Sequence, residues 1–279
     1  MKQVVILGEK GNLSKSLSKK FPAAIVIPKL DYLNWLRSPD EIDKFFFNLK
    51  INDDIADVYN CAGVTDPSED RSVINLVNYL LPVFLSERSY KLNYRLITFG
   101  TVMELLPKYS ASNPYLESKL KFYTRYLSDL DWQNRNLHFQ MHTLYGGHRI
   151  HKHMFVGQIF ESINSKKAFH MSGGDQIREY HHIDDDVEAI LHLSKTVGGG
   201  LIDISHGQPE KLKDIATSLF EHFNSRDNLK IATKSADEND NRNIVFQRTG
   251  NLSGSLFRPT IENLIKWFES LGVVDEERR

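Results

Sequence analysis

The chain has 279 residues, of which 41% are hydrophobic and 25% are charged, a balance typical of a folded globular protein rather than a disordered one. Its 35 basic and 36 acidic residues leave a net charge of −1, so no overall field favours nucleic acid or an anionic membrane as a partner. A single cysteine excludes an internal disulfide framework, and because no apolar run is long enough for a signal peptide or a membrane span, we expect a cytoplasmic protein.

The first predicted element is a strand that runs directly into a glycine turn and a helix. Residues 4–7 are apolar, the turn holds two glycines, and a helical pattern continues to Phe21. Such a turn lets the backbone approach a pyrophosphate, and the helix N-terminus adds N–H groups and a positive dipole end. We interpret the turn as a nucleotide-binding loop, although an ordinary strand–helix turn is the alternative and Ser14 stands where a third glycine is usual. Its binding residues would be Gly8, Lys10, Gly11, Asn12 and Leu13.

A second strand over residues 23–27 leads to the position that distinguishes NAD from NADP. Asp31 lies where an acid would bind the ribose diol of NAD, or at the end of a short third strand facing the adenine. Lys10 and Lys29 are placed where they could bind a 2′-phosphate instead. The balance favours NADP, with NAD as the alternative.

A helix is expected to begin at Ser38, a capping serine followed by proline in the first turn and Glu41 three residues past the cap. Residues 56–63 then predict a strand that ends in the small residues Cys61, Ala62 and Gly63, which suit close passage past a cofactor. Cys61 is interpreted as a packed residue rather than a nucleophile, because no base lies near it in the sequence. Asn78 lies within the helix that follows.

Three polar residues that could move a proton come next. Thr101 follows an apolar run that predicts a buried strand, so its hydroxyl would emerge at the strand end. Tyr115 and Lys119 are four residues apart, which places them on one face of a helix. The ammonium would favour the ionised phenol and lower the tyrosine pKa. Together they predict a site for moving a proton on or off a sugar or alcohol oxygen, with a solvated helix face as the alternative.

The remaining pattern extends the fold and adds a second lobe. A strand around residues 137–141, expected to end at residues 145–147, completes five or six alternations of strand and helix, which predict a doubly wound parallel sheet, an α/β fold. We expect a nucleotide-binding domain over residues 1–148, with residues 181–204 returning to it, and a mainly substrate-binding lobe over residues 149–279. Beyond residue 148 the sequence predicts helices at residues 155–163, 187–194, 212–223 and 260–271, a strand at 200–205 and a polar surface loop at 235–243.

Histidines recur in the second half of the chain. His148, His151 and His153 lie close together but have no carboxylate or cysteine partner at typical zinc spacing. Adjacent histidines on a strand face opposite sides, so His181 and His182 would not readily chelate one ion together. We therefore expect no metal site.

Taken in order, these motifs resemble the extended short-chain dehydrogenase/reductase superfamily, in its nucleotide-sugar epimerase/dehydratase branch. The resemblance spans essentially the whole chain, and its most specific part is residues 178–185, which resemble the family segment Arg-x-Phe/Tyr-x-His-Val-x-Asp. It implies a Rossmann lobe that binds NAD(P) and a smaller lobe that binds a nucleotide diphosphate sugar. The resemblance rests on Gly8, Gly11, residues 60–63, Thr101, Tyr115, Lys119, residues 145–146 and residues 178–185.

The resemblance also implies roles for individual residues. Tyr115 would be the general acid/base, Lys119 would hold the nicotinamide ribose, and Thr101 would bond the reacting oxygen of the substrate. Arg178 would contact the substrate diphosphate, with Arg242 as a second contact. Cofactor contacts would come from the glycine loop, Asp31, Cys61, Ala62, Gly63, Asn78, Tyr115 and Lys119.

Departures from the family pattern reduce the number of activities expected for this chain. The 4,6-dehydratases carry an Asp-Glu pair directly after the Ser/Thr, and Val102-Met103 stand here instead, so a dehydratase is not expected. The short chain resembles the 4-keto-sugar reductases of deoxysugar and surface-polysaccharide synthesis. An epimerase with tightly bound NAD and a non-catalytic scaffold of the same fold are the alternatives. Family members often pair through the helix that carries Tyr115, which implies a homodimer.

Overall fold

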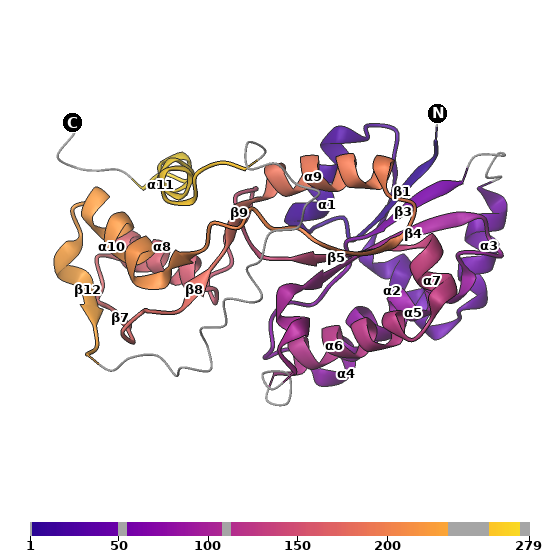
Figure 1. The fold of residues 1–279 in the computed structure, drawn as a ribbon, viewed down its shortest axis with the longest axis horizontal. Coiled ribbons are helices and arrows are strands. Elements are labelled where there is room, and N and C mark those ends of the chain that lie inside the picture. Colours follow the sequence, from indigo (N-terminus) through magenta and orange to yellow (C-terminus); the bar gives the residue numbers. More distant parts are fainter. Residues whose placement is uncertain (1, 50–54, 108–112, 234–256, 274–279) are drawn as a thin grey trace. The chain divides into compact units, whose positions relative to one another are not determined.

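The computed structural model describes residues 2–49, 55–107, 113–233 and 257–273, and these fall into two compact units (Figure 1). Unit 1 comprises Met1–Met141 and Ala189–Ile204, and unit 2 comprises His142–Glu188 and Ser205–Arg279. The chain therefore leaves unit 1 after the fifth strand and returns to it for one more strand. Among the described helices, none combines the length and the apolar character needed to cross a bilayer.

Unit 1 is built on one six-stranded sheet whose neighbouring strands are all parallel, which confirms the predicted α/β architecture. The order across the sheet is β10-β5-β4-β3-β1-β2. The strands are β1 (Val4–Leu7), β2 (Ile25–Ile27), β3 (Ala56–Asn60), β4 (Tyr94–Thr101), β5 (Leu137–Met141) and β10 (Gly200–Asp203). Because β1 connects to β2 on one side and β3 lies on its other side, the order reverses at β1 and β3, where ligands of such sheets bind.

Helices cover both faces of this sheet (Figure 1), so its central strands are buried on both sides, as all-parallel sheets require. Every residue of β1, β3 and β5 is buried. One core joins β1, β2, β3 and β4 to Trp35, Phe46 and Leu81 from the flanking helices. The helices are α1 (Asn12–Lys20), α2 (Lys29–Arg37), α3 (Asp40–Asn48), α4 (Arg71–Asn75), a π-helical turn (Leu76–Leu80), α5 (Leu81–Arg88), α6 (Pro114–Leu127) and α7 (Leu130–Arg135).

Three local predictions for this unit were wrong. Asp31 lies in the first turn of α2 rather than at the end of a third strand, because the helix begins directly after Pro28. Ser38 is the C-terminal cap of α2, and no side chain caps α3, whose N-cap residue is Pro39. The predicted strand over residues 137–147 is two strands, β5 in unit 1 and β6 (Thr143–Tyr145) in unit 2.

In the part of unit 2 that the structure describes, three helices and three short strand pairs surround a separate core. The pairs are β6 with β9 (Tyr180–His182), β7 (Phe169–Met171) with β12 (Leu229–Ile231), and β8 (Ile177–Arg178) with β11 (Glu210–Lys211). Ile159, Leu219 and Phe268 are fully buried in the core, one each from the three helices α8 (Phe155–Ser165), α10 (Leu212–His222) and α11 (Thr260–Ser270). A further helix, α9 (Ile183–Thr196), begins in unit 2, four residues earlier than predicted, and ends in unit 1.

Candidate functional site

The glycine turn has a geometry that only glycine allows. Gly8 follows β1 with φ of 95°, and a Cβ there would lie 2.8 Å from the backbone nitrogen of Ala62. The ends of β1 and β3 are thus in close contact at the point where the strand order reverses. Gly11 is the N-cap of α1 and its N–H donates to the Gly8 carbonyl at 3.0 Å. Ser14 is completely buried, so it serves the close helix–strand packing that a third glycine would serve.

Asn78 ties the segment after β3 to the helix that carries Tyr115. Its Nδ2 donates to the carbonyl of Val64 at 2.8 Å and to Ser118 Oγ at 3.1 Å, while its Oδ1 accepts from the Val64 N–H at 2.9 Å. The residue is buried and lies in the π-helical turn between α4 and α5. Such turns occur often at functional sites because they redirect one side chain. Asn78 therefore positions α6 against the end of β3.

Tyr115 and Lys119 lie in the first two turns of α6, one helical turn apart on the same face, as predicted. The helix begins here because Asn113 Oδ1 accepts from the Leu116 N–H at 3.2 Å and Pro114 occupies the first position. Lys119 Nζ donates to the carbonyl of Phe99 on β4 at 2.7 Å. This bond holds the lysine at the carboxyl-terminal part of β4, beside the turn of α6 that carries Tyr115.

Thr101 is the last residue of β4, where its predicted strand ends. It caps the short 3-10 helix of Val102–Leu105: its Oγ1 accepts from the Met103 N–H at 3.3 Å, and its own N–H donates to Glu104 Oε1 at 3.1 Å. This reciprocal pair of bonds is a capping box. Thr101, Tyr115 and Lys119 thus come from elements that pack together, since α6 contacts both β4 and the 3-10 helix.

The charges around Tyr115 differ from the sequence expectation. Burial raises the pKa of the Tyr115 phenol, and the negative charge of Glu104 raises it further, whereas we expected Lys119 to lower it. Burial also lowers the pKa of Lys119, and the charge of Glu104 opposes that shift. The expectation failed because it considered only the neighbour on the helix. At neutral pH this environment keeps the phenol protonated, as a proton donor requires.

Some of the other proposed cofactor residues are buried in unit 1, and others have side chains exposed to solvent. Burial raises the pKa of the Cys61 thiol, which therefore stays protonated and is no nucleophile at neutral pH. Lys10, Lys29 and Asp31 are exposed on unit 1, so the side chains that could separate NADP from NAD all face solvent. Asn60, at the end of β3, is buried, and its Oδ1 has no hydrogen-bond partner among the described residues. It lines a small cavity with Ala62, Asn78, Thr98 and Lys119.

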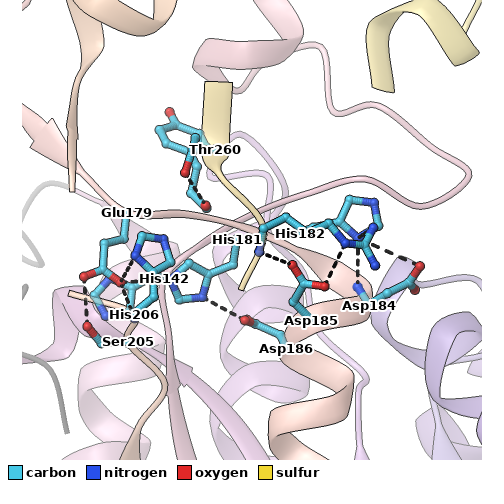
Figure 2. Close-up of polar contacts among 12 residues, drawn as sticks. His142, Glu179, His181, His182, Asp184, Asp185, Asp186, Ser205, His206 and Thr260 are labelled. Atoms are coloured by element: carbon cyan, nitrogen blue, oxygen red, sulfur yellow. Dashed lines mark hydrogen bonds and ion pairs between the residues drawn. The ribbon is translucent and has the colours of Figure 1, made fainter. Parts of the chain in front are cut away.

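In unit 2, the segment over residues 178–186 forms a buried hydrogen-bond network (Figure 2). Glu179 Oε1 accepts from Ser205 Oγ at 2.8 Å and from the Gly207 N–H at 2.9 Å, and Oε2 accepts from the His206 N–H at 3.0 Å. His181 lies between two carboxylates, with Nε2 2.9 Å from Glu179 Oε2 and Nδ1 2.7 Å from Asp186 Oδ1. The network fastens β9 to the segment that follows β10.

The same segment holds the chain before α11. The Arg258 N–H donates to Asp185 Oδ2 at 2.9 Å, and Arg258 Nε lies 2.9 Å from Asp185 Oδ1. Thr260 Oγ1 donates to the carbonyl of Tyr180 at 3.1 Å (Figure 2). Arg178 lies on β8, half-buried, with Nη1 donating to the carbonyl of Ile177 at 2.7 Å. Arg242, the other predicted phosphate contact, lies outside the described residues.

One trio in this network has the atoms of a metal site: ligand atoms of Glu179, His181 and His206 lie within 4.8 Å of one another. Both carboxylate oxygens of Glu179 already accept two hydrogen bonds each, and both ring nitrogens of His181 face carboxylates. His206 Nδ1 accepts from the Gln208 N–H at 3.0 Å. A metal ion would have to displace these hydrogen bonds, so the arrangement is better explained as a hydrogen-bond network that stabilises the fold.

Sequence reasoning missed two buried polar residues beside the proposed site, Glu104 and His138. It included Glu179 and His181 in the segment that resembles the family but did not predict the network that they form. Glu104 and Thr101 form a Thr-x-x-Glu capping pattern, a signal that was available in the sequence. His138 alternates with apolar residues in β5, and its acidic partner lies in the 3-10 helix after β4, so no local pattern reveals this pair. The acidic partners of His181 lie two and five residues away in the same segment, but the sequence does not show that they turn toward its ring.

Comparison with known proteins gives a fold. No family model and no curated protein matches the sequence. A dTDP-4-dehydrorhamnose reductase from Bacillus anthracis, solved in complex with NADP, is 17% identical with a TM-score of 0.73 and covers 97% of this chain and 100% of its own. WbmH from Bordetella bronchiseptica, solved with NAD⁺, is 16% identical with a TM-score of 0.73 and covers 98% of this chain and 100% of its own. WbmG from the same species, solved with NAD and UDP, is 14% identical with a TM-score of 0.69 over 98% and 96%. These likenesses confirm the fold that the sequence resemblance implied.

Proposed function

We propose that this protein reduces a nucleotide-activated keto-sugar of the 4-keto-6-deoxyhexose type, with NADPH as the cofactor. The observation that carries the proposal is the assembly of a protonated phenol, a lysine and a threonine hydroxyl at the carboxyl edge of a parallel sheet, beside a glycine turn. The reductase from B. anthracis and WbmG, solved with NADP and with NAD and UDP, are similar over nearly the whole chain and support this substrate class.

In this proposal, Tyr115 gives its hydroxyl proton to the oxygen that becomes the new sugar alcohol. Burial favours the protonated phenol, which suits a proton donor at neutral pH. Thr101 would hydrogen-bond the same oxygen and orient it, a role supported by its position at the end of the strand that packs against α6. Lys119, held by the Phe99 carbonyl, supplies positive charge beside the phenol while the proton leaves.

The residues around the glycine turn fit a dinucleotide. Gly8 and Gly11 leave the backbone of the turn open at the N-terminus of α1. Asn60 Oδ1, which has no hydrogen-bond partner within the described part of the chain, offers an acceptor in the neighbouring cavity. NADPH, when bound, would supply the hydride. Lys10 and Lys29, both exposed, would contact a 2′-phosphate, and Asp31 a ribose diol if NAD is used.

Arg178 is the proposed contact for the substrate diphosphate, because a guanidinium fork matches phosphate oxygens. It projects from β8 in unit 2, the unit that does not contain the proton-donor residues. Arg242 remains a second proposed contact for the diphosphate. Two copies of the chain are proposed to form a dimer through α6.

The first experiment measures absorbance at the nicotinamide band, for the purified protein and then after addition of NADPH and a panel of nucleotide 4-keto-6-deoxysugars. Consumption of NADPH with one of these sugars is the expected result, and it would identify the substrate. NAD retained through purification and released on denaturation, without NADPH consumption, would favour an epimerase. Absence of NADPH binding, measured as no quenching of its fluorescence, would favour a scaffold and contradict the proposal.

A further inference from the structure

A buried acid–histidine pair lies beneath the Thr101 end of β4. Glu104 is 2% exposed and His138, on β5, is 1% exposed, and His138 Nε2 lies 3.1 Å from Glu104 Oε2. The backbone makes room for them at Gly100, where a Cβ would overlap both the carboxylate and the imidazole nitrogen. The function proposed above uses neither residue. A carboxylate and an imidazole that both lose their water on folding need a reason beyond packing.

The hydrogen bonds around His138 allow two arrangements that differ by one proton. Thr98 Oγ1 lies 2.8 Å from His138 Nδ1 and 3.2 Å from the Leu137 carbonyl, and a hydroxyl has a single proton to donate. If Thr98 donates to the carbonyl, Nδ1 carries a proton, and a further proton is then shared between Nε2 and Glu104. If Thr98 donates to Nδ1, only Nε2 carries a proton, and Glu104 keeps a full negative charge. The pair can therefore be neutral or singly negative.

This charge acts on the groups that face it. Burial raises the pKa values of Tyr115 and Tyr123 on α6 and lowers that of Lys119, and the charge of Glu104 acts to raise all three. On the side of β3, the thiol of Cys61 faces Lys119. Thr98 and Lys119 line the same small cavity, so the hydroxyl that switches between the two arrangements lies beside the lysine of the site. A negative Glu104 favours the protonated forms of both Tyr115 and Lys119.

We propose that Glu104 and His138 form a charge-setting pair, in which His138 fixes how much negative charge Glu104 presents to Tyr115 and Lys119. Both are positioning residues that act through the proton donor and its lysine. The role in turnover rests on the proposed reductase function. The charge acting on Lys119 does not, and it can be measured without a substrate.

Two conservative variants should move the pH dependence in opposite directions. Glu104→Gln keeps an oxygen for the Thr101 N–H but removes the charge, so the alkaline limb of kcat/KM should move to lower pH by on the order of one unit. His138→Gln removes the imidazole that shares a proton with Glu104, so the carboxylate keeps its full charge and the alkaline limb should move to higher pH. A structural role alone would lower activity and stability in both variants without opposite shifts.

Asp57→Asn is the matched control. It makes the same carboxylate-to-amide change in a buried ion pair, Asp57 with Arg95, at the amino-terminal end of β3 and β4. This variant should lose stability but leave the alkaline limb unchanged. Equal shifts in the control, no shift in either test variant, or shifts of the same sign in both would overturn the proposal.

A readout independent of catalysis separates this inference from the proposed function. Acetic anhydride attacks only unprotonated amines, and mass spectrometry of the Lys119 peptide, with the exposed Lys230 as the internal standard, gives the labelling rate against pH. Labelling of Lys119 should begin at lower pH in Glu104→Gln and at higher pH in His138→Gln. If no sugar is reduced but the labelling shifts appear, the charge-setting pair stands and the reductase function fails. If Glu104→Gln does not fold, an unshifted His138→Gln overturns the proposal by itself.

Discussion

At the scale of single residues, the proposed chemistry depends on what surrounds Tyr115 more than on its spacing from Lys119. Burial and Glu104 both favour the protonated phenol, and Lys119 is anchored to the Phe99 carbonyl. The spacing on α6 brings the two side chains to one face, while β4 and its 3-10 helix supply the groups that set their protonation. A tyrosine in this setting is suited to donate a proton.

Tyr115→Phe should lower turnover by about 10²–10⁴-fold, the usual range for loss of a general acid, because the ring remains but the proton does not. NADPH affinity, measured by fluorescence quenching, should stay within about twofold of the unmodified protein. Tyr94→Phe is a matched control, because that hydroxyl donates to the Leu85 carbonyl at 2.5 Å and Tyr94 begins β4, at the other end of the strand from Thr101. A Tyr115→Phe protein with a near-normal rate would contradict the role of this phenol.

Gly8→Ala should weaken NADPH binding and lower the free energy of unfolding by about 1–3 kcal/mol. The reason is that φ is 95° and the new Cβ would lie 2.8 Å from the Ala62 nitrogen, so the turn must move away from β3. Urea unfolding and fluorescence titration measure the two effects. Gly198→Ala is the control, since nothing lies within 4 Å of a Cβ there, and it should change stability by less than about 0.5 kcal/mol. Equal losses in both variants would rule out the strain at Gly8 as the cause.

At the scale of elements, the segment from β8 to α9 organises unit 2. Its buried polar side chains are paired: Glu179 with His181, and His181 with Asp186, while the buried Asp185 pairs with the exposed Arg258 (Figure 2). Burial opposes the charge of His181, but Asp186 and Glu179 outweigh it and raise the pKa to about 9. Burial likewise opposes the charge of Glu179, and the histidines around it lower its pKa to about 2. The network is therefore an imidazolium between two carboxylates at neutral pH.

This network predicts a stability that depends on pH. The pKa of His181 in the folded protein is about 9, above the unfolded value of 6.5, so its contribution is complete below pH 6.5 and is lost as the pH rises through 9. The free energy of unfolding in urea should therefore fall by on the order of 2 kcal/mol between pH 6.5 and pH 9. His181→Gln should be less stable at pH 6.5 and should have a flatter profile across this range. A variant with the same slope as the unmodified protein would show that another group titrates.

At the scale of the whole molecule, the chain leaves unit 1 after β5 and comes back through α9 to supply β10 at the edge of the sheet. Arg95 on β4 fixes this returning segment, because its guanidinium donates to the Ser194 carbonyl at 2.6 Å and the Val197 carbonyl at 3.1 Å. The same guanidinium binds Asp57 on β3, with Nε 2.8 Å from Oδ1. One side chain thus joins β3, β4 and the end of α9.

Arg95→Leu should lower the free energy of unfolding by about 2–4 kcal/mol, because it leaves two carbonyls and the Asp57 carboxylate without the guanidinium. Lys2 also reaches Asp57, at 2.8 Å, and keeps the loss from being larger. The double variant Arg95→Leu/Asp57→Leu should recover part of the stability, since no charge is then left buried. Urea unfolding measures the free energy of unfolding of Arg95→Leu, Asp57→Leu and the double variant. A double variant that loses more stability than the two single variants together would contradict this account.

The sequence by itself determined the α/β class, the glycine turn after the first strand, and the shared helix face of Tyr115 and Lys119. These follow from local periodicity and from residue types that only a few backbone conformations allow. It did not determine the position of Asp31, which depends on where α2 begins, or the protonation of Tyr115. Tertiary structure alone decided that Glu104 faces His138 and that Glu179 faces Ser205, because those partners come from distant parts of the chain. The free energy of a buried charge depends on its distance from charged and polar groups in other parts of the fold, and a local sequence pattern does not contain that distance.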